Sequence, residues 1–351
     1  MGGLNGFWKG KKVFITGHTG FKGTWLSLIL IKQGAKVKGY SMDGFEKGSF
    51  YDSLKLADDI ESIKGDITDY SSLEREVSIF SPDIIFHLAA QPLVLESYSD
   101  PRGTFSTNVM GTLNVLEVSR SVESVKSIIS VTTDKVYKNN EWDYSYREID
   151  SLGGYDPYSA SKASADILTN SYKQSFFNER EVGICAVRAG NVIGGGDFSE
   201  NRLIPDIVRS VNLKHCLDVR YPFAIRPWQH VIEPLKAYME IAKKQYANPD
   251  FGSAYNVGPD SENACKVEYI LNFSEKFWEG EFKWQRVSSV KMHEAGLLKL
   301  DSSLVRAKTN WKPTLTIDET LERTLNWYKK QMQGYDTRCL CESDIEYFFN
   351  A

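Results

Sequence analysis

The sequence lacks an apolar stretch of the roughly 18 residues that a membrane helix needs. Its best apolar run, Trp25 to Ile31, is short and is interrupted by Ser27. Met1 to Lys12 has no apolar signal-peptide core, and Gly6 does not fit the N-myristoylation pattern. We therefore expect a cytoplasmic protein with no membrane partner.

Cysteine and histidine are scarce, with five residues of each among 351. Cys339 and Cys341 lie close together, but no second Cys or His pair accompanies them, so we expect reduced cysteines and no metal. The 42 Lys and Arg residues against 46 Asp and Glu give a net charge of −4, which predicts no nucleic-acid partner. Aromatic residues make up 13% of the chain, enough for a sizeable core, which excludes disorder as the main state.

Strand-like apolar runs alternate with helical patterns through the first 190 residues. This alternation indicates βαβ units and a parallel sheet covered on both faces. We expect strands near 13–16, 36–40, 83–88, 127–133 and 182–187, and helices near 25–30, 71–80, 104–122 and 159–177.

The pattern changes after Asn191, where Gly194 to Gly196 break it and an irregular stretch rich in Arg and Pro runs to His230. A helix at 234–243 and a strand at 253–257 follow. The fold class expected is α/β, a Rossmann-type doubly wound parallel sheet with a smaller C-terminal α/β substrate lobe. We assign 1–190 to a cofactor-binding Rossmann domain with later returns near 230–258, and 191–351 mainly to the substrate domain.

The first candidate site is the glycine-rich turn 17–23 (GHTGFKG), which joins a predicted strand to a predicted helix. Glycines let backbone N–H groups approach a pyrophosphate, and the helix N-terminus adds partial positive charge. Its GxxGxxG spacing departs from GxGxxG, so a tight turn without a ligand is the alternative. The second strand ends at 40–43 (YSMD) without a well-placed ribose-binding acid and without an arginine, so NAD and NADP both stay open. Asp66 and Ile67 lie where adenine could bind, although Asp66 could instead cap the helix at Ser71.

Two further motifs could carry chemistry. Tyr158 and Lys162 are four residues apart at the start of a predicted helix and share one face, which an ordinary i,i+4 pair would also do. A neighbouring ammonium would lower the ordinary tyrosine pKa of about 10 and make the phenol a usable base. The segment 132–135 (TTDK) follows a predicted strand, at the edge where open α/β sheets bind ligands. The alternative is an aspartate cap beside a solvated lysine.

Together these motifs resemble the extended short-chain dehydrogenase/reductase superfamily and, across essentially the whole chain, its CDP-glucose 4,6-dehydratase family. The resemblance implies dehydration of CDP-glucose to CDP-4-keto-6-deoxyglucose with bound NAD, by a homodimer or homotetramer. Its product would enter deoxysugar biosynthesis for surface polysaccharide such as lipopolysaccharide O-antigen. The matching strings are 87–94 (HLAAQPLV), 107–112 (TNVMGT), 133–135 (TDK), 153–159 (GGYDPYS), 188–197 (RAGNVIGGGD) and 225–231 (IRPWQHV).

The resemblance also implies catalytic roles. Tyr158 would take the proton of the C4 hydroxyl while hydride passes to NAD, helped by Lys162, and Thr133 would bond the C4 oxygen. Asp134 would be the acid at the C6 hydroxyl, and the hydride would return to C6. Many related dehydratases place Glu where this chain has Lys135, which could act as the C5 base or steady the enolate.

The binding residues follow from the same motifs. Arginines of the irregular stretch suit pyrophosphate oxygens, with a surface arginine as the alternative for each, and Arg188 is a further candidate. His87 is expected to be structural, and Leu95 stands near where many relatives carry Arg. For the cofactor we predict Gly17, His18, Gly20, Phe21, Gly23, Asp66, Ile67, Leu88, Ala89, Ala90, Asn108, Tyr158 and Lys162. For the substrate we predict Gln91, Asn191, Arg202, Arg220 and Arg226.

Two other functions fit the scaffold. A 4-epimerase or 4-keto reductase would use Tyr158 and Lys162 but needs no groups for eliminating water, so Asp134 and Lys135 favour the dehydratase. A non-catalytic NAD-sensing protein could dispense with Tyr158 and Lys162, yet both are present.

Overall fold

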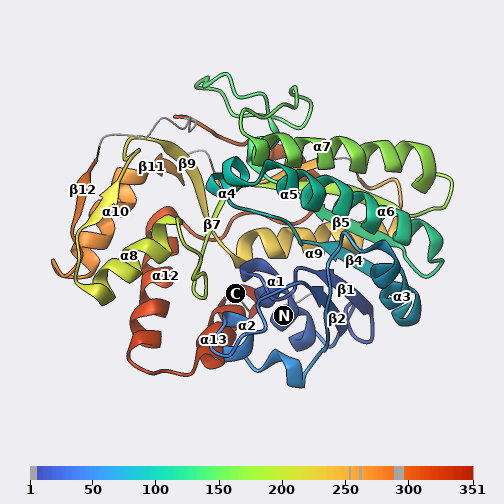
Figure 1. The fold of residues 1–351 in the computed structure, drawn as a ribbon, viewed down its shortest axis with the longest axis horizontal. Helices are drawn as coiled ribbons and strands as arrows, with labels where there is room; N and C mark the ends of the chain where they lie inside the picture. Colours follow the sequence, from blue (N-terminus) through green and yellow to red (C-terminus); the bar gives the residue numbers. More distant parts are fainter. Residues whose placement is uncertain (1–5, 253, 261–262, 288–295, 351) are drawn as a thin grey trace.

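The computed structural model describes residues 6–252, 254–260, 263–287 and 296–350 (Figure 1). At its centre lies a seven-stranded sheet of order β10-β6-β5-β4-β1-β2-β3, in which every pairing is parallel. The predicted doubly wound α/β class is therefore confirmed. Its strands are β1 (Lys12–Thr16), β2 (Lys36–Ser41), β3 (Glu61–Lys64), β4 (Ile84–His87), β5 (Ser127–Val131), β6 (Gly183–Ala189) and β10 (Ala254–Val257).

Alternate residues of each central strand face opposite layers of helices. Val13 and Ile15 of β1 pack in one core with α1 (Phe21–Lys32) and α9 (Ile232–Ala247). Phe14 packs in a second core on the other face. The helices there are α3 (Tyr70–Phe80), α6 (Gly111–Ser121) and α7 (Pro157–Tyr172), and α7 and α6 run side by side in Figure 1.

The chain direction across the sheet reverses at β1. From β1 the chain builds outward through β2 to β3, and then returns to β4 on the other side of β1. Open α/β sheets bind ligands outside the carboxyl ends of their strands at such a switch point. The glycine turn after β1 and the segment after β4 both lie there.

Smaller elements form the second lobe. A three-stranded sheet has the order β11-β9-β7, and β12 pairs with β8. Arg338 of the last helix binds Asp59 of the first lobe at 2.6 Å, which ties the C-terminal helix back to the Rossmann sheet. The strands are β7 (Asn191–Ile193), β8 (Leu217–Val219), β9 (Ile225–His230), β11 (Ala264–Lys266) and β12 (Trp284–Arg286). The helices are α8 (Leu203–Leu213), α10 (Val267–Phe277), α11 (Ser303–Lys308), α12 (Ile317–Met332) and α13 (Thr337–Asn350).

Several details differ from the sequence prediction. The helix expected at 104–122 is divided into α5 (Pro101–Phe105), a π-helical segment η2 (Ser106–Met110) and α6. A second π-helical segment, η4 (Lys173–Phe177), ends α7. β3 was not predicted, and Ser253 of the predicted strand 253–257 lies outside the described residues. The remaining short helices are α2 (Phe50–Ser53), η1 (Leu56–Asp58), α4 (Val94–Ser99) and η3 (Asp134–Val136).

Within the part of the chain that the structure describes, no helix combines the length and apolar character needed to cross a membrane.

Candidate active site

The glycine turn leaves room only for backbone at two of its positions. Gly17 has φ +76°, and a Cβ there would lie 2.6 Å from the backbone nitrogen of Ala89. A Cβ on Gly23 would lie 2.0 Å from the carbonyl oxygen of Gly17. Gly20 is the N-cap of α1 and supplies no side-chain cap, and the first turn of α1 carries no acidic residue. The helix N-terminus thus presents backbone N–H groups and partial positive charge, which fits a dinucleotide pyrophosphate.

A cleft of about 720 Å³ runs from this turn into the second lobe. Its size falls in the range of small-molecule and cofactor sites. Residues predicted for cofactor and substrate, though far apart in sequence, meet in it. Those lining the cleft are Gly17, Gly20, Phe21, Gly23, Asp66, Ile67, Leu88, Ala89, Ala90, Thr133, Asp134, Lys135, Tyr158, Lys162, Asn191, Arg202, Arg220 and Arg226.

The turn after β5 places an acid in the cleft. The Thr133 hydroxyl donates to Asp134 Oδ1 at 3.0 Å and accepts from the Lys135 backbone N–H at 3.4 Å. Asp134 is 2% exposed, and its Oδ2 has no hydrogen-bond partner among the described residues. Burial raises the pKa of Asp134, although the charges of Lys135 and other cations oppose this. A carboxyl group that favours its protonated form is suited to act as a general acid.

Helix α7 presents the predicted base. Asp156 caps the helix by accepting from the Ser159 backbone N–H at 2.9 Å. Burial raises the pKa of Tyr158 to about 12, partly opposed by its hydrogen bond with Thr133. Lys162 Nζ donates to the carbonyl oxygen of Val131 at 3.0 Å, and burial lowers its pKa to about 7. In this dry setting both side chains favour their neutral forms.

The arginines predicted for the substrate separate into two groups. Arg202, Arg220 and Arg226 line the cleft, and Arg202 is held by Asp197 at 3.2 Å. Arg188 does not line the cleft, because its guanidinium pairs with Asp166 at 2.7 Å in the protein interior. The prediction for Arg188 is therefore wrong.

Three other predicted contacts have side chains engaged in the scaffold rather than lining the cleft. The buried His18 ring bonds the Ser41 hydroxyl at 2.8 Å and that of Ser62, and burial lowers its pKa to about 4. The Gln91 side-chain amide donates to Thr104 Oγ1 at 2.8 Å. Asn108 Oδ1 accepts from the Gln91 backbone N–H at 2.9 Å and fixes the turn after β4.

The structure also shows the contacts of Asp66 and His87. Asp69, and not Asp66, caps α3, while Asp66 Oδ1 accepts from the Thr68 backbone N–H at 2.8 Å and the residue lines the cleft. His87 is buried between the hydroxyls of Thr16 and Thr112, at 2.7 and 2.9 Å. The structural role expected of His87 agrees with these contacts.

Lys22 of the glycine turn lines the cleft and was not predicted as a site residue. Burial, together with the charge of Arg202, lowers its pKa to about 8. Its charge in turn lowers the pKa of Lys162. The available signal was a cation inside a phosphate-binding turn, which a search for glycine spacing passes over.

Comparisons with known proteins show the family of this chain. A family model described as GDP-mannose 4,6 dehydratase matches residues 14–324. The chain belongs to this family. The CDP-glucose 4,6-dehydratase of Salmonella typhimurium is 44% identical over 351 residues, which cover 98% of each chain. The dTDP-D-glucose 4,6-dehydratase of Dictyostelium discoideum is 29% identical over 280 residues, 75% of this chain and 62% of that protein. The predicted resemblance to CDP-glucose 4,6-dehydratases is confirmed.

Solved structures match the fold across most of the chain. An epimerase of Methanothermobacter thermautotrophicus superposes with a TM-score of 0.82 at 23% identity, covering 93% of this chain and 95% of that one. A dTDP-glucose 4,6-dehydratase from Bacillus anthracis, solved in complex with NAD, gives a TM-score of 0.77 at 21% identity, covering 92% and 98%.

Proposed function

We propose that this chain catalyses the NAD-dependent dehydration of CDP-glucose to CDP-4-keto-6-deoxyglucose. The observation that carries the proposal is a buried, unpaired carboxyl oxygen of Asp134 in the same cleft as Tyr158 and Lys162. Oxidation at C4 needs only the tyrosine and lysine, whereas loss of water also needs an acid for the leaving C6 hydroxyl. The 44% identity to a CDP-glucose 4,6-dehydratase supports the same reaction and the same nucleotide.

The residues of the cleft divide the steps of this reaction among them. Tyr158 removes the C4 hydroxyl proton while Thr133 bonds the C4 oxygen, and Lys162 favours the phenolate. Bound NAD supplies the hydride acceptor at C4 and later the hydride donor at C6. The C4 ketone acidifies the C5 proton, and Asp134 donates a proton as the C6 hydroxyl leaves as water. Lys135, half-buried on the same turn and lining the cleft, either receives the C5 proton or balances the charge of the enolate.

The two lobes divide the ligands between them. We assign NAD to the lobe of residues 1–190, held by the glycine turn and the ends of β2 and β3, and the sugar nucleotide mainly to residues 191–351. Ser41, Met42 and Asp43 line the cleft after β2, where an NADP enzyme would need a cation for the 2′-phosphate. This segment supports NAD over NADP. Asn191, Arg202, Arg220 and Arg226 face the substrate side.

The proposed function also implies a location and an oligomeric state. We place the enzyme in the cytoplasm as a homodimer or homotetramer that supplies deoxysugars for surface polysaccharide. Self-association is supported by exposed apolar side chains on the neighbouring elements α5, η2 and α7, namely Phe105, Met110 and Ile167. Size-exclusion chromatography with light scattering measures the assembly directly.

The activity is tested by incubating the protein with CDP-glucose and NAD in deuterated water and following the product mass. We expect loss of one water and retention of one solvent deuteron at C5. Parallel reactions with UDP-, GDP- and dTDP-glucose rank the bases, with CDP-glucose first. Unchanged CDP-glucose from NAD-saturated protein would refute the dehydratase. An isomer of equal mass would instead indicate 4-epimerisation.

A further inference from the structure

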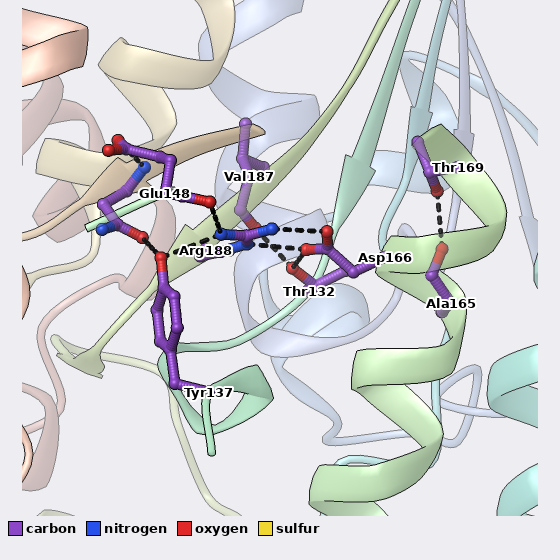
Figure 2. Close-up of polar contacts among 9 residues, drawn as sticks. Thr132, Tyr137, Glu148, Ala165, Asp166, Thr169, Val187 and Arg188 are labelled. Carbon is purple, nitrogen blue, oxygen red and sulfur yellow. Dashed lines mark hydrogen bonds and ion pairs between the residues drawn. The ribbon is translucent and has the colours of Figure 1, made fainter. Parts of the chain in front are cut away.

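A buried ion pair that the mechanism does not use lies beside the active-site turn (Figure 2). Arg188 of β6 binds Asp166 of α7 through two hydrogen bonds, Nε to Oδ2 at 2.8 Å and Nη2 to Oδ1 at 2.7 Å. The two side chains are only 4% and 3% exposed. Desolvating two charges offsets much of their attraction, so a pair of this kind adds little stability by itself. The pair also makes hydrogen bonds to the neighbouring turn.

The pair holds both ends of the turn 133–136. The Thr132 hydroxyl, just before the turn, donates to Asp166 Oδ2 at 3.1 Å and also lies 3.3 Å from a second acceptor, the Val187 carbonyl oxygen of β6. Tyr137, just after it, accepts from Arg188 Nη1 at 2.9 Å and donates to Asn256 Oδ1 at 2.6 Å. Figure 2 shows Tyr137 beside the guanidinium of Arg188 and Thr132 beside the carboxylate of Asp166. Asp134 lies between these two attachment points.

Hydrogen bonds, one of them to Asp166, also hold the turn against α7, the helix that carries the base. Three consecutive residues of the chain, 131 to 133, bond to α7. The Val131 carbonyl accepts from Lys162, the Thr132 hydroxyl donates to Asp166, and Thr133 bonds Tyr158. Asp166 lies one helical turn after Lys162 on the same face. A shift of Asp166 would therefore displace the acid turn relative to the base.

We propose that Asp166 and Arg188 are positioning residues that clamp both ends of the turn 133–136 and so fix Asp134 relative to Tyr158. The catalytic consequence rests on the proposed dehydratase function, whereas the mechanical consequence does not. A displacement of about 1 Å in a catalytic group can cost about 100-fold in rate. Loss of the clamp should therefore lower kcat without weakening binding.

The test compares two buried threonines, Thr132 and Thr169. Thr132→Val keeps the shape and removes the hydroxyl that bonds Asp166, while Asp166 stays paired with Arg188. Thr132→Ser restores the hydroxyl. The matched control is Thr169→Val on α7, whose hydroxyl bonds the Ala165 carbonyl of its own helix, at 2.8 Å (Figure 2). Tyr137→Phe removes the hydroxyl at the other end of the turn.

Turnover of CDP-glucose is the first readout. Thr132→Val and Tyr137→Phe should each lower kcat by about 10- to 100-fold, with KM within about twofold of wild type. Thr132→Ser should recover most of kcat, and Thr169→Val should leave kcat within about twofold. Equal kcat for Thr132→Val and Thr169→Val would overturn the catalytic part of the proposal.

Amide hydrogen exchange of the peptide 133–138, in protein saturated with NAD alone, is the second readout. We expect at least about tenfold faster exchange in Thr132→Val and no change in Thr169→Val. Unchanged exchange in Thr132→Val would overturn the clamp. If wild type fails to convert CDP-glucose while the exchange difference is present, the proposed function fails and the clamp stands.

Discussion

Replacing Asp134 by asparagine should separate the first half of the reaction from the second. The change keeps the size of the side chain but removes the proton that Asp134 would give to the leaving C6 hydroxyl. A positioned general acid contributes about 10²- to 10⁴-fold, or about 3–5 kcal/mol of the barrier. Tyr158 and Lys162 are untouched, so hydride transfer from C4 should continue. A single-turnover assay should therefore show NADH absorbance that rises and persists, with little loss of water from the sugar.

The same substitution should stabilise the fold at neutral pH. Because burial raises the pKa of Asp134, its ionised form is disfavoured in the folded protein. The stabilisation of the folded protein that comes from the neutral carboxyl is fully present below the ordinary aspartate pKa. It is lost as pH rises through the raised pKa of Asp134. Asparagine stays neutral throughout, so the variant should gain about 1–3 kcal/mol at pH 7. The difference in Tm should shrink as pH falls toward the ordinary aspartate pKa of about 4 and should be lost below it.

Asp344→Asn is the matched control for both effects. Asp344 is a buried carboxyl of α13 that does not line the cleft. Its amide variant should also raise Tm at pH 7 but leave elimination unchanged. Full elimination activity in Asp134→Asn would show that Asp134 is not the acid. A Tm below wild type would show that its charge does not destabilise the fold.

Two further predictions concern the base and the dependence of stability on pH. Tyr158→Phe should lower NADH formation by about 10²- to 10⁴-fold. The control Tyr172→Phe changes another tyrosine of α7, whose hydroxyl bonds Glu117 of α6, and should stay within about twofold. Equal losses in stopped-flow absorbance would contradict the role of Tyr158. Burial raises the pKa of Asp344 to about 6 although Arg323 lies 2.7 Å away. The free energy of unfolding of the wild type should therefore fall by about 3 kcal/mol as pH rises from 4 to 6. Calorimetry of Asp344→Asn should show a flatter Tm curve across this interval, and an unchanged slope would refute this assignment.

The sequence predicts the parts of this molecule whose physical cause is local. β1 and β4 are continuous apolar runs because both faces of the central sheet are covered, and periodicity identifies them. β3 escaped prediction because it is an edge strand, with Glu61 and Lys64 exposed at its ends. The glycine turn, the turn 133–136 and the pair of Tyr158 with Lys162 each place their chemistry within a few residues.

Residues whose use depends on distant partners could not be assigned in this way. Arg188 and Arg226 look alike in sequence, yet Arg188 is turned inward by Asp166, which lies on a different element. His18 sits in the glycine turn but is drawn beneath it by Ser41 and Ser62, 23 and 44 residues away. Asn108 was predicted to touch the cofactor and instead bonds the backbone of the turn after β4. In each case the side chain has the expected chemistry, and the tertiary contact decides its target.

Desolvation explains how the three reactive groups can share one cleft. Burial raises the pKa of Tyr158 to about 12, lowers that of Lys162 to about 7 and raises that of Asp134. All three shifts favour neutral side chains, which suits an acid but not a phenolate base. A positive charge brought close to Tyr158 would favour the phenolate, and oxidised nicotinamide carries such a charge. Tyr158 would therefore be the stronger base while oxidised NAD is held by the glycine turn, which suits its task of removing the C4 hydroxyl proton.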